Sequence, residues 1–236
     1  QRLASGWVDE DIIEINEGSI FPKESLVSLL EVIGEGLNIN HLSRVEKIRE
    51  DGRCVEIRVE TESQEIVESY DWLIVATPVE QAISLCSGLD LNLSGKSESC
   101  LVAWGPSKDL EGAIPEGFVV SRYGGSEGMM VKLDSIMSDK FLEYSKEEMV
   151  AEVTSRLGIP SLGWRAHRWR FSRAISGPGS VTSGSRVSVI GDAFGMPIGT
   201  AGASLDSAAR AVANLHLTPI SANFRRKSTQ TTLSNW

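Results

Sequence analysis

The sequence predicts a mixed α/β fold (α+β), in which a domain containing a β-meander receives a second, antiparallel-sheet domain as an insertion. Three observations indicate this fold. Alternating strand patterns with turn residues between them fill residues 44–69, and a strand, a glycine-rich loop and a helix follow one another over 187–216. Between these stretches, residues 88–178 break into short strand candidates separated by Gly, Pro, Ser and Asp turns.

The composition is that of an ordinary globular protein. The chain has 236 residues, of which 41% are hydrophobic and 23% charged, enough to bury a real core. Its net charge of −9 argues against nucleic-acid binding, which depends on neutralising phosphates. Cys54, Cys86 and Cys100 show neither metal-ligand spacing nor an even framework, which indicates reduced thiols, a cytoplasmic protein and no metal site. No apolar run approaches the length of a membrane span, so we expect no membrane association.

The first part of the chain, residues 1–87, predicts a hairpin, a helix and a meander. Residues 1–22 alternate weakly, as in a short hairpin or an irregular segment, and a helix is expected from about Lys23 to Glu35. The Asp51-Gly52 pair between two alternating segments is a hairpin signal. The expected strands cover residues 44–48, 54–60, 65–69 and 72–76, and one or two helical turns follow over 80–86.

The middle part, residues 88–178, predicts an antiparallel sheet covered by one helix. The helix should run from about residue 146 to 157, because Ser145 can cap its start and Glu148 follows three residues later. The strand candidates cover residues 99–104, 117–122, 129–133 and 167–174.

The stretch 187–216 contains the most candidate ligand-binding features in the sequence. A short β-branched run suits a buried strand, Gly191-Asp192 ends it with a carboxylate, and a loop of glycines follows in which backbone can approach a ligand closely. The helix from about Ala203 offers unpaired N–H groups in its first turn, where a phosphate or an electron-rich ring edge binds. An ordinary βα unit whose glycines only permit tight packing is the alternative. The apolar residues that recur at helical spacing are Leu205, Ala208, Ala209, Val212, Ala213 and Leu215.

The strand, Gly-Asp turn, glycine loop and small-residue helix resemble the C-terminal flavin-binding motif of FAD-dependent amine oxidases. The renalase-like branch of NAD(P)/FAD-dependent oxidoreductases is the branch that the chain resembles most. The resemblance implies that the Gly191-Asp192 turn places Asp192 on the ribityl hydroxyls of FAD. It also implies that Gly199, Thr200, Ala201 and Gly202 lie beside the flavin.

Two other stretches are similar to the same family. Val45, in the first meander strand, corresponds to a valine whose backbone contacts the FAD adenine, and a simple core valine is the alternative. His167-Arg168-Trp169-Arg170-Phe171 is similar to a strand that returns from the substrate domain toward the flavin, with phenylalanine where tyrosine is usual. Alternation puts His167 and Trp169 on one face. Trp169 either lies beside the flavin or is an inward core residue with solvated arginines opposite, and His167 is a weak catalytic candidate.

A G-x-G-x-x-G dinucleotide fingerprint is absent from the sequence. In the family this fingerprint occupies an N-terminal strand-turn-helix, so the resemblance implies an incomplete chain whose FAD site needs a missing N-terminal segment or a second chain. It further implies that residues 1–87 and 179–217 are parts of an FAD-binding Rossmann-like domain and that residues 88–178 are a substrate domain. Residues 218–236 then form a polar tail.

The first functional hypothesis is a flavin-dependent oxidoreductase that transfers a hydride from a small amine or from reduced nicotinamide, NAD(P)H, to FAD. One alternative is a non-catalytic fragment or binding module that retains the fold without FAD. A second alternative is a desaturase-like or protoporphyrinogen-oxidase-like flavoenzyme. A larger and more apolar substrate region than residues 88–178 would be expected in that case.

Overall fold

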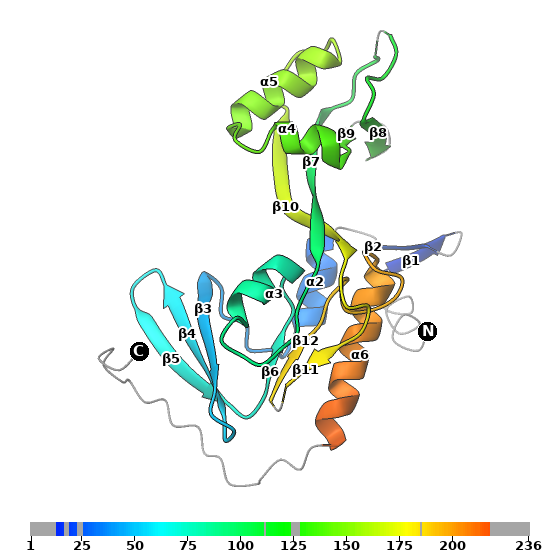
Figure 1. The fold of residues 1–236 in the computed structure, drawn as a ribbon. Helices are drawn as coiled ribbons and strands as arrows, with labels where there is room; N and C mark the ends of the chain where they lie inside the picture. Colours follow the sequence, from blue (N-terminus) through cyan, green and yellow to red (C-terminus); the bar gives the residue numbers. More distant parts are fainter. Residues whose placement is uncertain are drawn as a thin grey trace. The chain divides into compact units, whose positions relative to one another are not determined.

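A computed structural model describes residues 13–16, 19–22, 26–110, 112–123, 128–184 and 186–217 (Figure 1). The chain divides into two compact units, 1–43 and 44–236. In the first unit, β1 (Ile13–Asn16) and β2 (Ser19–Pro22) pair antiparallel, and α2 (Leu26–Gly34) follows. The expected hairpin and helix are therefore present over these residues. The polar tail predicted over 218–236 lies outside the described residues.

The meander opens the second unit and confirms the strands expected there. β3 (Ser43–Glu50), β4 (Val55–Thr61) and β5 (Glu65–Tyr70) form a three-stranded sheet in that order, with β4 and β5 antiparallel. The hairpin at Asp51 forms as expected, because Asp51 Oδ1 accepts the backbone N–H groups of Arg53 at 2.8 Å and Cys54 at 2.9 Å. These donors, Cys54 first, hold the pKa of the Asp51 carboxyl below its usual range.

A second three-stranded sheet contains the two short buried strands that the sequence predicted. β6 (Leu73–Val75) and β12 (Val187–Val189) pair in parallel, and β11 (Thr182–Ser183), which was not predicted, pairs antiparallel with β12. Helix α3 (Val79–Leu85) follows β6. These elements and the meander share a first core, which includes Ile48, Val55, Val75, Ala82, Cys86, Ala174, Val187, Val189 and Phe194.

The expected antiparallel sheet is four-stranded. β7 (Lys96–Pro106), β8 (Phe118–Tyr123), β9 (Gly128–Leu133) and β10 (Arg165–Ser176) lie in the order β10–β7–β9–β8. Helices α4 (Ser135–Lys140) and α5 (Lys146–Arg156) pack on one face. This face forms a second core, which includes Leu101, Ala103, Val131, Leu133, Met137, Phe141, Met149, Val153, Trp164 and Ala166.

Two helices cover this sheet, so the expectation of one covering helix was wrong. Helix α4 is short, and its start is capped by the Asp134 side chain, which accepts from the Met137 N–H at 2.8 Å. The cap predicted for α5 is confirmed. Ser145 Oγ accepts from the Glu148 N–H at 3.2 Å, and the Glu148 carboxylate accepts from the Ser145 N–H at 2.8 Å. This second hydrogen bond lowers the pKa of Glu148.

The last helix, α6 (Ala201–Leu217), is present, but the residues whose spacing predicted it are not the ones that face the core. Ala203, Ser207 and Ala211 are fully buried, whereas Leu205 is 73% exposed and Val212 46% exposed. The buried residues are small because α6 lies close to the backbone that follows β12. The exposed residues form an uncovered apolar stripe, which is defined here as Leu205, Ala209 and Val212.

β10 extends through both cores. Ala174, near the end of β10, is buried in the first core, and Ala166, near its start, is buried in the second. The domain boundaries drawn from the sequence stay a prediction. All three cysteines are free, and burial raises the pKa of the Cys86 thiol to about 11. Among the described residues, no helix is both long enough and apolar enough to cross a membrane.

Candidate functional site

The candidate site begins where the parallel strands β6 and β12 end. Gly191 follows β12 with φ of +135°, a conformation that favours glycine. Ser207 of α6 fixes this turn, because its Oγ accepts from the Gly191 N–H at 3.0 Å and donates to the Gly191 carbonyl at 3.1 Å. The carboxyl ends of parallel strands are where α/β folds bind ligands. Asp192 therefore lies at the edge where a cofactor is expected.

The half-buried Asp192 has one oxygen engaged and one available. Its Oδ2 accepts from the backbone N–H of Ala174 in β10 at 2.7 Å, and its main-chain carbonyl accepts from the Gly199 N–H at 2.9 Å. Within the described ranges, Oδ1 has no partner. The carboxylate is thus held in place from behind while it keeps an acceptor for a hydroxyl donor.

The loop glycines fall into two groups. A Cβ on Gly195 would lie 2.2 Å from the carbonyl oxygen of Ala203, and one on Gly199, whose φ is +79°, would lie 2.4 Å from the carbonyl oxygen of Ala174. These two glycines permit the chain to pack against itself, as the alternative interpretation proposed. A Cβ on Gly202 would meet only Thr200 Oγ1 at 3.7 Å. Gly202 therefore leaves open space beside the start of α6.

The first turn of α6 is only partly capped. Thr200 Oγ1 accepts from the Ala203 N–H at 3.0 Å, and the Thr200 carbonyl accepts from the Ser204 N–H at 3.2 Å. The N–H groups of Ala201 and Gly202 have no partner in the part of the chain that the structure describes, and both residues are exposed. These donors, at the positive end of a 17-residue helix, suit an anionic or electron-rich group.

Thr77, in the Ala-Thr-Pro turn after β6, adds another polar group at this edge. It follows β6, and its Oγ1 is buried without a hydrogen-bond partner. Its carbonyl lies 4.0 Å from where a Cβ on Gly191 would stand. A buried hydroxyl without a partner is costly.

Val45 is half-buried, and its side chain packs against the first core. This packing agrees with the alternative of a core valine. A backbone contact with the FAD adenine stays a prediction.

Trp169 and His167 lie on the same face of β10, with ring centroids 4.4 Å apart in an edge-to-face arrangement. Trp169 is 46% exposed, so the interpretation of an inward core tryptophan is wrong. Arg168 points to the other face, where it is half-buried and donates to the Phe141 carbonyl. Sequence alternation assigned the shared face correctly, but it could not tell which face the helices cover.

The uncovered face of the sheet is rich in aromatic and apolar side chains. Cross-strand pairing joins Trp104 to Arg165 and to Met130, and directly opposed residues share a face. β7 is apolar at every position from Cys100 to Trp104, a pattern typical of strands buried on both faces. The residues on this uncovered face are Cys100, Val102, Trp104, Val119, Met130, Lys132, Arg165, His167 and Trp169.

The fold is similar to part of several solved flavoprotein structures. The OxyS anhydrotetracycline hydroxylase from Streptomyces rimosus matches with a TM-score of 0.53 and 14% identity, over 81% of this chain and 41% of the hydroxylase. p-Nitrophenol 4-monooxygenase PnpA from Pseudomonas putida DLL-E4 matches with a TM-score of 0.51 and 15% identity, over 81% and 53%. The flavin-dependent monooxygenase PieE, solved with FAD and substrate, matches with a TM-score of 0.51 and 16% identity, over 80% and 36%.

At these identities the similarity shows a shared fold. The chain spans 36%, 41% and 53% of the three flavoproteins. No protein-family model matches the sequence, and no curated protein matches it. The fold is that of part of FAD-dependent hydroxylases and monooxygenases, and nothing in it is specific to the amine oxidases or to the renalase-like branch.

Proposed function

We propose that this chain forms part of a flavin-dependent oxidoreductase and that Asp192, with the start of α6, holds the FAD. The observation that carries this proposal is the set of unsatisfied polar groups at one edge: Asp192 Oδ1, the buried Thr77 hydroxyl and the N–H groups of Ala201 and Gly202. Their chemistry fits a ligand that combines hydroxyls with an electron-rich ring. FAD, when bound, would supply the capacity to accept a hydride.

The remainder of the flavin site is contributed by further polypeptide, either an N-terminal segment or a second chain. The sequence holds no dinucleotide fingerprint to cradle the pyrophosphate. The stripe on α6 supports this proposal, because Leu205 and Val212 are exposed on a helix of the same half-site. The three flavoproteins, which are longer than their matched regions, support it as well.

A small aromatic substrate, lying on the uncovered face of the four-stranded sheet, is favoured over a small amine. That face presents Trp169, Trp104 and Met130, whose surfaces suit an aromatic ring. Two of the similar proteins are named as a hydroxylase and a nitrophenol monooxygenase. A monooxygenase places one atom of O₂ in its substrate and releases the other as water. The two electrons required come from a hydride donor, for which we propose NAD(P)H.

Amine oxidation of the renalase-like type is the second candidate. In that reaction the hydride comes from the amine substrate, whereas in the monooxygenase reaction it comes from NAD(P)H. Anaerobic mixing of the FAD-loaded protein with NADH or NADPH should bleach the flavin absorbance, whereas benzylamine should leave it unchanged. Bleaching by benzylamine alone would overturn the monooxygenase assignment in favour of amine oxidation.

Cofactor binding is tested by titrating FAD into the chain and following the quenching of flavin fluorescence. Asp192→Asn retains an oxygen for the Ala174 N–H but removes the charge, so we expect the Kd for FAD to rise about tenfold or more. The control is Asp206→Asn, because Asp206 pairs with Arg210 at 2.9 Å further along α6, and we expect an unchanged Kd. If neither the chain nor its Asp206 variant binds FAD, the binding module without flavin becomes the better account.

A further inference from the structure

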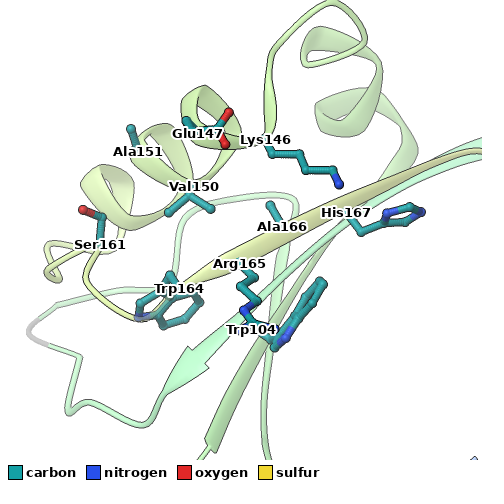
Figure 2. A pocket seen from close by; sticks show the side chains of 10 residues that line it. All are labelled: Trp104, Lys146, Glu147, Val150, Ala151, Ser161, Trp164, Arg165, Ala166 and His167. Atoms are coloured by element: carbon teal, nitrogen blue, oxygen red, sulfur yellow. The ribbon is translucent and has the colours of Figure 1, made fainter. Parts of the chain in front are cut away.

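The uncovered face of the four-stranded sheet carries positive charge that the described part of the chain does not neutralise. Strand alternation directs Lys132, Arg165 and His167 away from α4 and α5. Figure 2 shows this at the start of β10, where Ala166 points toward α5 while Arg165 and His167 lie on the other side of the strand. Lys132 and Arg165 are exposed, and neither has an ion-pair partner among the described residues.

Two carboxylates that flank this face are engaged elsewhere. Glu98, near the start of β7, pairs with Arg173 of β10 at 2.8 Å. Asp134 follows Lys132 by two residues, but its Oδ1 caps α4 by accepting the Met137 N–H at 2.8 Å. In a chain of net charge −9, the unpaired cations therefore make this face a local region of positive charge, which attracts an anion.

Lys132 lies across one strand from the aromatic pair Trp169 and His167. Val102 of β7 is directly opposite His167 on one side and Lys132 on the other, which separates the Cα atoms of these two residues by about 10 Å. Burial raises the pKa of the Cys100 thiol, and the nearby Lys132 ammonium opposes this increase. Because Cys100 is directly opposite Trp169, Lys132 extends toward the position of that ring. A single aromatic ring over Val102 can therefore contact the aromatic pair while an acidic substituent reaches Lys132.

We propose that the aromatic substrate of this face carries one carboxylate and that Lys132 is the residue that selects for it. The ring lies against Trp169 and His167, and the carboxylate contacts the Lys132 ammonium. Trp169 is nearer along β10 than His167 to Ala174, whose N–H binds Asp192, so the ring rather than the carboxylate is directed toward the proposed flavin. This selection rests on the proposed function for its reaction, whereas binding of the acid itself does not require FAD.

The test is ¹⁹F NMR of 4-fluorobenzoate added to the flavin-free chain, with neutral 4-fluorobenzamide as the matched probe. We expect a shift and broadening of the benzoate resonance that saturate with protein concentration. The Kd of the amide should be about tenfold weaker or more, because the amide lacks the charge-assisted contact with Lys132. Equal affinities of the two probes, or no benzoate binding up to about 10 mM, would overturn the proposal.

Variants of exposed residues assign the preference to one side chain. Lys132→Met should remove the preference for benzoate and leave the Kd of the amide unchanged, which shows that the aromatic surface is intact, while Lys132→Arg should retain the preference. The control is Arg122→Met, because Arg122 lies on β8 of the same sheet and pairs with Asp109 at 3.3 Å, and we expect both Kd values to be unchanged. If Arg165→Met removed the preference and Lys132→Met did not, the assignment to Lys132 would be wrong.

This proposal and the flavin proposal fail in different measurements. A chain that binds FAD but shows no preference for benzoate would remain a candidate oxidoreductase, and its substrate would lack the acidic group. A preference that depends on Lys132, in a chain that binds no FAD, would retain the acid-binding site and remove the flavin function.

Discussion

Helices α5 and α6 differ in how much of their apolar surface the chain covers. In α5, Met149 and Val153 are buried against the four-stranded sheet, and a complete capping box closes the first turn. In α6, the buried positions are occupied by Ala203, Ser207 and Ala211, while Leu205 is 73% exposed. The face of the four-stranded sheet that α4 and α5 cover is therefore fully packed. The part of the chain that carries Asp192 and α6 leaves the apolar stripe of α6 exposed.

The hydrogen bonds at the two helix starts are similar. Ser145 accepts from the Glu148 N–H in α5 as Thr200 accepts from the Ala203 N–H in α6, and in the described part of the chain the first two N–H groups of each helix have no partner. The difference lies beside α6, where Asp192 Oδ1 and the buried Thr77 hydroxyl also have no partner among the described residues. Buried polar groups without partners and exposed apolar residues cost stability in an isolated chain, and this is the physical basis of our proposal that a ligand and further polypeptide bind there.

The largest expected effect separates the two helices directly. Met149→Ala should lower the free energy of unfolding by about 2–5 kcal/mol, because it leaves a cavity in the second core. Leu205→Ala should change it by no more than about 0.5 kcal/mol, because an exposed side chain loses little on truncation. Urea unfolding of the two variants measures both values.

A matched outcome would contradict the comparison. If Leu205→Ala cost as much as Met149→Ala, the stripe on α6 would already be covered, for example by self-association. Sedimentation of the unsubstituted chain and of the Leu205→Ala variant distinguishes that case, because removing a residue of a self-association interface would shift the oligomeric state of the variant.

A smaller effect is expected from two glycines of the loop. Gly195→Ala should destabilise the chain by about 1–3 kcal/mol, because the new Cβ would overlap the Ala203 carbonyl oxygen and force backbone to move. Gly202→Ala should raise the free energy of unfolding by about 0.4–1 kcal/mol, because alanine suits the helix and meets open space. Thermal unfolding with a urea series compares them.

FAD titration of the Gly202→Ala variant tests whether the open space beside Gly202 belongs to the proposed cofactor site. Gly202→Ala fills the space beside the start of α6, so it should weaken FAD binding while it stabilises the chain. A Gly202 variant that binds FAD as well as the unsubstituted chain would remove the start of α6 from the proposed site.

Features set by short-range chemistry were predictable from the sequence. The Asp51-Gly52 hairpin and the Ser145–Glu148 capping box depend on hydrogen bonds between residues at most three positions apart, and both formed as expected. Helix α4 was missed although Asp134 supplies the same kind of cap, because its six residues are too few to show helical periodicity.

The faces of the elements were less predictable, because tertiary packing decides them. Leu205 and Val212 recur as core residues would, yet the close approach of α6 to Gly191 selects Ala203 and Ser207 for the buried side. On β10, alternation correctly placed Trp169 and His167 on one face. Which face of the sheet is covered depends on how α4 and α5 pack on β7 and β10, and alternation along a single strand does not determine that. Thr77 and the free oxygen of Asp192 emerge only when the ends of β6 and β12 are placed side by side.

The smallest expected effect concerns the cap of α5 and tests whether that half of the comparison is as complete as its hydrogen bonds indicate. Ser145→Ala should cost about 1 kcal/mol at neutral pH, because it removes the acceptor for the Glu148 N–H. Glu148→Gln should cost less, because the amide oxygen can still accept from the Ser145 N–H. Since folding lowers the pKa of Glu148 below its ordinary value of 4.5, its ionic contribution is present above the unfolded pKa and is lost as the pH falls through the folded one. The difference between Glu148→Gln and the unsubstituted chain should therefore vanish in acid while that of Ser145→Ala persists, and urea unfolding at neutral and acidic pH measures both. A Glu148→Gln difference that did not change with pH would mean that the carboxylate does not cap α5 through its charge.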